Sequence, residues 1–121
     1  ISGDGGAWYL PRVVGKAKAM EMALTCCVLD ALQARDWGLV THVVEPDTLL
    51  QKAWELAEQI TAFPPKSIRL NKRLIRQSAE VPLETALDLA GSFQAIVQNT
   101  QDQQEAVNAL LERRAPDFKG S

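Results

Sequence analysis

Apolar residues recur at helical spacing along most of the chain. Over residues 49–60 the apolar positions fall at intervals of three and four, which is the period of an amphipathic helix. The same spacing predicts further helices over residues 16–24, 65–79 and 83–99 and from residue 102 onward. Pro64, Pro65 and Pro82 lie between these segments, and proline interrupts a helix except in its first turn. The pattern predicts a mainly α-helical chain.

Two short helices near the start are predicted from their end signals. Residues 5–12 follow Asp4, a residue type favoured at the N-cap, and Gly15 is a natural stop just beyond them. Asp30 is expected to cap another helix that ends at Gly38.

One segment has the pattern of a strand. Residues 39–44 are rich in β-branched side chains and are followed by Glu45 and Pro46. A lone strand cannot satisfy its own backbone groups, so we expect its partners in another chain or in a part that is missing here. The first residues, Ile1 and Ser2, also lack an initiating Met. Both observations predict a piece of a longer protein.

Composition narrows the class of protein. The 121 residues are 46% apolar and carry a net charge of −2, which predicts one folded domain and gives no general attraction to nucleic acid or to anionic membrane. No apolar run approaches the length of a membrane span. The two cysteines, Cys26 and Cys27, are neighbours in sequence, which does not suggest a disulfide or a metal site and predicts a cytoplasmic protein.

The first glycines carry the clearest candidate chemistry. Asp4 lies between Gly3 and Gly5, and two large aromatic residues, Trp8 and Tyr9, follow. Glycines let a backbone approach a ligand closely, and a helix that starts after them points its free N–H groups at the same place. This combination is typical of a pocket wall.

Several motifs, in order, resemble the C-terminal part of the enoyl-CoA hydratase/isomerase (crotonase) family. Residues 3–15 look like its glycine loop and following helix, and residues 16–25 keep the alanine, glutamate, leucine and threonine of its next segment. Residues 30–40 and 43–46 match the run that follows, and residues 105–118 complete the pattern. Their order and spacing carry the resemblance across almost the whole chain.

The resemblance implies a fold and an assembly. It makes residues 1–46 the end of a crotonase core, an α/β fold built as a ββα spiral, with the one short strand packed on sheet outside this chain. It makes residues 47–121 a C-terminal helical oligomerisation region that forms a trimer, often a dimer of trimers. No metal or redox cofactor is implied, since coenzyme A (CoA) is part of the substrate, and neither nucleic acid nor a membrane is expected as a partner.

The resemblance also implies an activity. The complete protein is expected to hydrate 2-enoyl-CoA thioesters of fatty acid metabolism through an enolate-type intermediate. In the family's hydratases the oxyanion donors and both catalytic glutamates precede the glycine loop, so this chain is expected to be inactive alone. The alternative is an isomerase or an acyl-CoA hydrolase that uses Asp4. An alternative of another class is a helical self-association module without catalysis.

The loop residues have two interpretations each. Asp4 is a catalytic base or proton shuttle, or only an N-cap; several family isomerases and a dehalogenase carry an aspartate in this loop, one residue away. Trp8 lines the acyl pocket or packs against the next helix. Gly3, Gly5 and Gly6 are the backbone that places these side chains beside the substrate.

Two later residues are implied as substrate-binding. Arg113 matches a basic residue that, in the family, reaches the phosphates of CoA bound to a neighbouring subunit; alternatively it complements the dipole of the last helix. Phe93 touches the acyl or pantetheine end of the substrate, or belongs to the core.

A basic run on the helix over residues 65–79 is read as a solvated face, with CoA phosphates or nucleic acid as the alternatives. His42 is read as structural or solvent-facing.

Overall fold

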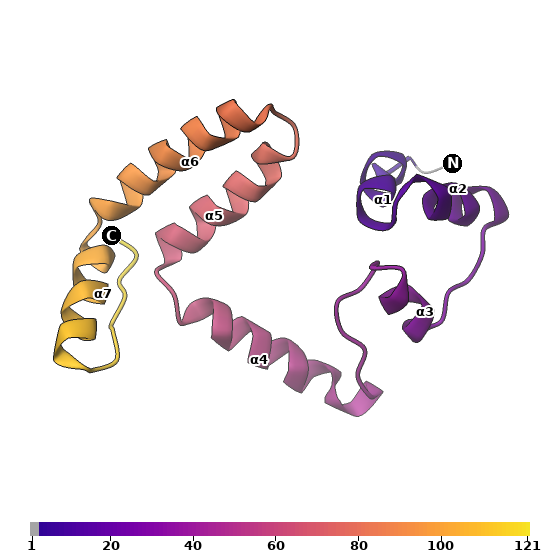
Figure 1. Ribbon diagram of the computed structural model, residues 1–121. Helices are drawn as coiled ribbons and strands as arrows, with labels where there is room; N and C mark the ends of the chain where they lie inside the picture. Colours follow the sequence, from indigo (N-terminus) through magenta and orange to yellow (C-terminus); the bar gives the residue numbers. More distant parts are fainter. Residues whose placement is uncertain (1–2) are drawn as a thin grey trace. The chain divides into compact units, whose positions relative to one another are not determined.

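The computed structural model describes residues 3–121, and Ile1 and Ser2, where we read a truncated start, lie outside them. The chain divides into two compact units, one extending to Leu50 and the other Gln51–Ser121. Each unit is described by itself (Figure 1). The predicted division at residue 46 into a core end and an oligomerisation region stays a prediction.

The first unit contains three short α-helices. Helix α1 spans Gly6–Val14, α2 spans Lys16–Thr25 and α3 spans Ala31–Asp36, and a 3-10 turn, η1, covers Pro46–Thr48. Helices α1 and α2 pack against each other, and the buried side chains Val14 and Ala19 come one from each. Gly15 separates them with a φ of 81°, which lets the chain reverse without a strained side chain.

The end signals were right for α3. For α1 the predicted stop at Gly15 was right and the predicted start signal was wrong. Asp30 accepts the Gln33 N–H at 2.8 Å, Gln33 reaches back to the Asp30 N–H, and Gly38 ends the helix with a φ of 77°. Before α1, however, Gly5 is the N-cap residue, with a φ of 85° and no side-chain cap. The predicted capping role of Asp4 is therefore wrong: the left-handed conformation at Gly5 lets the backbone begin the helix one residue later.

The predicted strand over residues 39–44 does not form within the described part of the chain. The Leu39 and Val40 N–H groups donate to the Ala34 carbonyl instead, at 2.8 and 3.3 Å, and so close the end of α3. Side-chain preference for a strand is weak without a partner for the ladder. The remainder of the fold prediction, a mainly helical chain, is confirmed.

The second unit is built from four helices that the apolar stripes located to within a few residues. Helix α4 spans Leu49–Thr61, beginning just before the unit does, α5 spans Pro65–Ser78, α6 spans Leu83–Gln98 and α7 spans Gln101–Glu112. Helices α5 and α6 form a hairpin, and α7 follows α6 after a sharp turn (Figure 1). Helix α6 continues through Gly91, which we had marked as a weak point.

The predicted cap of the last helix is also wrong. Thr100, not Asp102, is the N-cap residue of α7, and its hydroxyl accepts the Gln103 N–H at 3.1 Å. Asp102 is the second residue of the helix and is only 2% exposed. Its carboxylate instead accepts the Lys119 and Gly120 N–H groups near the end of the chain.

Large apolar side chains of the second unit remain in solvent. Trp54 of α4 is 68% exposed, Leu87 of α6 is 61% exposed and Leu110 of α7 is 78% exposed. Apolar surface on this scale usually marks a contact with another chain or segment. None of the helices of the described residues is long and apolar enough to cross a bilayer.

Candidate functional site

The glycine loop holds a free carboxylate in front of α1. The Gly5 carbonyl accepts both the Trp8 and Tyr9 N–H groups at 3.0 Å, which fixes the loop to the first turn. A Cβ on Gly5 would lie 3.3 Å from the Tyr9 ring, and its φ of 85° already disfavours any side chain. Asp4 is exposed, and its carboxylate makes no hydrogen bond or ion pair with the rest of the described chain. The geometry leaves Asp4 open to an external group.

Trp8 is held by its own helix. Its ring meets Tyr9 edge-on at 4.7 Å between centroids, and the Arg12 guanidinium lies 3.6 Å from the ring centroid while donating to the Trp8 carbonyl at 2.9 Å. The side chain is still 44% exposed. Trp8 therefore presents a fixed aromatic surface beside the loop. Its proposed contact with an acyl chain stays a prediction.

A cavity of about 280 Å³ lies between α1 and α2 and reaches the loop at Gly6. Its lining is mostly small or apolar: Gly6, Ala7, Leu10, Pro11, Lys16, Ala19, Met20 and Ala23. Sequence reasoning missed this cavity. The available signal was the set of alanines on the facing sides of the two helices, which leave space where larger residues would fill it.

Phe93 faces α5. It is 9% exposed and lines a cavity of about 320 Å³ between α5 and α6, together with Phe63, Leu70 and Leu74. The Arg73 guanidinium lies 5.3 Å from the ring centroid. These contacts support the interpretation of Phe93 as a core residue. They leave its contact with a substrate as a prediction.

Arg113 ends α7 in an unusual backbone conformation. Its φ is 54°, in the left-handed region, where helices normally place glycine. Its N–H donates to the Leu110 carbonyl at 3.3 Å and the next N–H, of Arg114, donates to the Ala109 carbonyl at 3.0 Å. The side chain is exposed, and no ion pair joins it to any described residue. Arg113 is thus a cation held at a fixed point and available to an anion.

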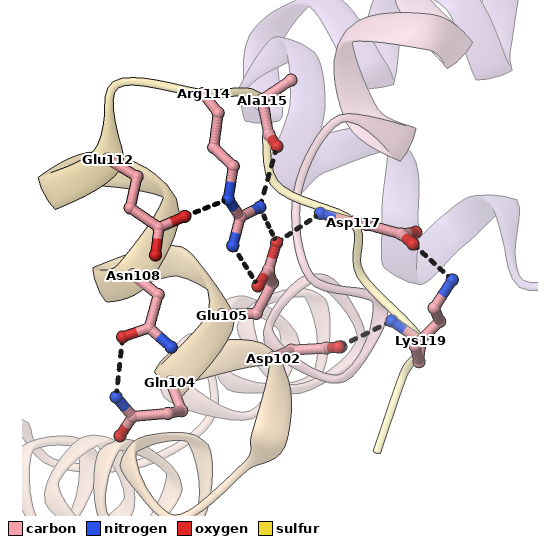
Figure 2. A network of polar contacts seen from close by, with 9 residues as sticks. All are labelled: Asp102, Gln104, Glu105, Asn108, Glu112, Arg114, Ala115, Asp117 and Lys119. Carbon is pink, nitrogen blue, oxygen red and sulfur yellow. Dashed lines mark hydrogen bonds and ion pairs between the residues drawn. The ribbon is translucent and has the colours of Figure 1, made fainter.

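The neighbouring Arg114 is fully engaged. Its guanidinium contacts Glu105 at 2.5 and 2.8 Å and Glu112 at 2.6 Å, as Figure 2 shows. The hydrogen bonds from Arg114, followed by the bond from the Asp117 N–H at 2.8 Å, lower the pKa of Glu105 to about 2. The carboxylates of Glu105 and Glu112 in turn raise the pKa of Arg114. Sequence reasoning missed this network because its partners are nine and twelve residues apart, which is no helical repeat.

This network predicts a loss of stability in mild acid. The folded pKa of Glu105, about 2, lies below its ordinary value of 4.5, so its contribution is fully present above pH 4.5 and decreases as the pH falls from 4.5 toward 2. We expect the thermal midpoint of Glu105→Gln to decrease less than that of the wild type as the pH falls over this range. The measurement is a melting series from pH 6 to pH 2.5. A Glu84→Gln control, which alters an exposed carboxylate of α6, should leave the curve unchanged.

Arg113→Gly is expected to raise the free energy of unfolding by about 0.5–1 kcal/mol, because glycine adopts a positive φ without the steric cost that arginine bears. Urea unfolding measures the change, and Leu111→Gly, inside α7, should instead destabilise. A loss of stability in Arg113→Gly would show that the arginine side chain is itself structural.

The other candidate groups do not assemble into a site. No three His, Cys, Asp or Glu side chains of the described residues are placed to hold a metal. His42 is exposed, as the solvent-facing interpretation requires. On α5 the cations Arg69, Lys72 and Arg76 are exposed and form no ion pair within the described chain.

Comparison with known proteins identifies the family. The family model described as "Enoyl-CoA hydratase/isomerase" matches residues 1–121. A 1,2-epoxyphenylacetyl-CoA isomerase of Escherichia coli is 39% identical over 96% of this chain, and a probable enoyl-CoA hydratase of Rhizobium meliloti is 38% identical over 98%. The crystal structure of an enoyl-CoA hydratase from Bacillus anthracis covers the whole chain with a TM-score of 0.96 and 36% identity. The chain belongs to the enoyl-CoA hydratase/isomerase family.

The chain spans slightly less than half of these relatives. It covers 44% of the Escherichia coli isomerase, 46% of the Rhizobium meliloti protein and 47% of the Bacillus anthracis chain. As the resemblance implied, the chain corresponds to the C-terminal part of a protein of the crotonase family.

Proposed function

We propose that the complete protein containing this chain hydrates 2-enoyl-CoA thioesters through an enolate-type intermediate. The observation that carries the proposal is the family match over the full chain, supported by the close structural likeness to the enoyl-CoA hydratase of Bacillus anthracis. In this proposal the oxyanion donors and both catalytic glutamates lie before the glycine loop. The chain supplies the last wall of the site, and by itself it is inactive.

The geometry of the loop fits that wall. Gly3, Gly5 and Gly6 allow a thioester to approach the backbone, and the exposed face of Trp8 offers a flat apolar surface to an acyl group. CoA serves as the handle of the substrate, and no metal or redox group takes part. The protein acts in the cytoplasm, and neither nucleic acid nor a membrane is its partner.

The assembly we propose is a homotrimer or a dimer of trimers built by residues 47–121. The exposed apolar side chains of α4, α6 and α7 support it, because association would bury them. In this assembly Arg113 binds the phosphates of CoA held by a neighbouring subunit, where its planar guanidinium suits paired bonds to phosphate. Phe93 acts mainly as core.

A second activity in the same family is favoured by one observation. The Asp4 carboxylate is exposed and unpaired within the described chain, which suits a group that moves a proton at an enolate carbon. The protein would then isomerise the double bond of an enoyl-CoA, or hydrolyse an acyl-CoA. One relative, 39% identical, is named a 1,2-epoxyphenylacetyl-CoA isomerase.

Asp4→Ala in the complete protein separates these activities. If the protein is a hydratase that uses upstream glutamates, the rates of hydration and of isomerisation stay within about twofold of the wild type. If Asp4 is the proton shuttle, isomerisation falls by about 10²–10⁴. Asp47→Ala, an exposed carboxylate on η1, is the matched control and should change neither rate.

The exposed apolar faces also favour a function of another class, a helical module that only self-associates. Light scattering combined with an activity assay decides between the two. Assembly of the complete protein without turnover of any enoyl-CoA would support the module and contradict the hydratase. A monodisperse monomer at high concentration would contradict both the module and the proposed trimer.

A further inference from the structure

The last residues of the chain run back along α7. The chain turns at the C-terminal end of that helix, and at its other end the Ser121 carbonyl accepts the Gln101 N–H at 3.0 Å and the Asp102 N–H at 3.4 Å. Figure 1 shows the C-terminus beside the start of α7. We call residues 115–121 the strap. Its last carbonyl is an acceptor for two N–H groups that a helix N-terminus otherwise leaves unpaired.

A buried carboxylate holds the end of the strap. Asp102 is 2% exposed, and its two oxygens accept the Lys119 N–H at 2.7 Å and the Gly120 N–H at 2.8 Å. Both bonds are charge-assisted, and the carboxylate stands in the first turn of α7, where the helix dipole favours negative charge. Gly120 has a φ of 80°, a conformation that glycine adopts without the steric cost that other residues bear.

A second carboxylate holds the middle of the strap. The Glu105 Oε1 atom accepts the Asp117 N–H at 2.8 Å, and the same carboxylate also accepts hydrogen bonds from the Arg114 guanidinium. Figure 2 shows that Asp102 and Glu105 project from α7 toward the strap. The two residues are three positions apart in α7, and they therefore lie on the same face of the helix.

Arg113 lies between these attachments and the end of α7. A non-glycine residue in the left-handed region persists only where its surroundings determine it. The contacts that constrain it are the Arg114 bonds to Glu105 and Glu112 and the bond from the Asp117 N–H of the strap to Glu105.

We propose that the strap is a latch, closed by Asp102 and Glu105, and that the closed latch positions Arg113 to bind the phosphates of CoA. The second part rests on the proposed function, and the first part does not. Asp102 and Glu105 are positioning residues, since neither contacts the ligand in this scheme.

Hydrogen exchange tests the latch directly in the complete protein. Asp102→Asn removes one charge-assisted acceptor and is expected to speed exchange of the Lys119 and Gly120 amides by at least about tenfold, with helices α5 and α6 unchanged. Gly120→Ala leaves both carboxylates in place and should open the strap through backbone strain. Asp88→Asn, which removes one exposed carboxylate from α6, is the charge-matched control and should have no effect.

Titration with free coenzyme A tests the positioning role. We expect Asp102→Asn and Arg113→Ala each to raise the Kd for coenzyme A by about five- to tenfold, and Asp102→Asn to leave kcat within about twofold. The double variant should bind no more weakly than Arg113→Ala, because the latch acts through that residue.

The outcomes separate the two claims. Unchanged exchange in both Asp102→Asn and Gly120→Ala would overturn the latch, whatever the enzyme does. Faster exchange with an unchanged Kd, or additive effects in the double variant, would overturn the positioning role. A complete protein that binds coenzyme A through Arg113 but turns over no enoyl-CoA would contradict the proposed function and leave the latch and its positioning role supported.

Discussion

The isolated 121-residue chain is expected to hydrate a 2-enoyl-CoA at least about 10⁴-fold more slowly than the complete protein. The proposed mechanism needs two donors that stabilise the thioester oxyanion, and removing one such donor alone costs about 10²–10³ in rate. It also needs carboxylates that move the proton, which contribute about 10²–10⁴. In the proposed arrangement all of these groups precede Gly3.

The measurement compares the purified chain with the complete gene product on the same thioester. Circular dichroism must first show that the isolated chain is helical, since an unfolded chain would be inactive for a trivial reason. Supplying the preceding part of the protein as a separate polypeptide should restore activity if the two associate. Activity of the isolated helical chain near that of the complete protein would contradict the proposed mechanism, because the residues described here would then have to supply it.

The helices were predictable because their signals are local. The stripe over residues 49–60 lies within α4, and the pair Asp30 and Gln33 forms the reciprocal cap that its spacing suggests. Proline and glycine located most of the ends. Where a boundary depends on residues within one turn of it, the sequence contains the information.

Two of the errors involve partners far away in sequence, and the third involves a backbone conformation. Thr100 and Asp102 are both suitable N-cap residues, and the choice between them is made by the strap, seventeen and eighteen residues beyond Asp102. Residues 39–44 have the composition of a strand, but a strand needs a neighbour. Asp4 was misread as a cap because Gly5 takes a conformation that sequence spacing does not reveal.

The residue types of the candidate site were predictable, but the contacts and backbone conformations that hold these residues in place were not. The glycine loop was identified from its residues and from its resemblance to a family motif, and Arg113 from that resemblance alone. The structure shows Asp4 and Arg113 exposed. The left-handed backbone of Arg113 and the carboxylates beside it were not foreseen. An arginine at that position gives no local signal, since glycine is the residue usually expected there.

Phe93→Ala is expected to lower the free energy of unfolding by about 3 kcal/mol. The ring is 9% exposed and packs between α5 and α6, where the Arg73 guanidinium also contacts it. Truncation removes these contacts and enlarges a cavity that already measures about 320 Å³. Because the cavity is partly open before the change, we expect a value at the low end for a buried phenylalanine.

Urea unfolding at concentrations where the chain is monomeric measures this effect. Leu87→Ala, on the same helix but 61% exposed, is the matched control and should cost less than about 0.5 kcal/mol under those conditions. Phe93→Leu keeps most of the buried surface, so a raised KM in that variant with near-normal stability would assign the ring to the substrate. A cost below about 1 kcal/mol for Phe93→Ala would contradict its role as core, since burial of an aromatic ring between two helices contributes more than that.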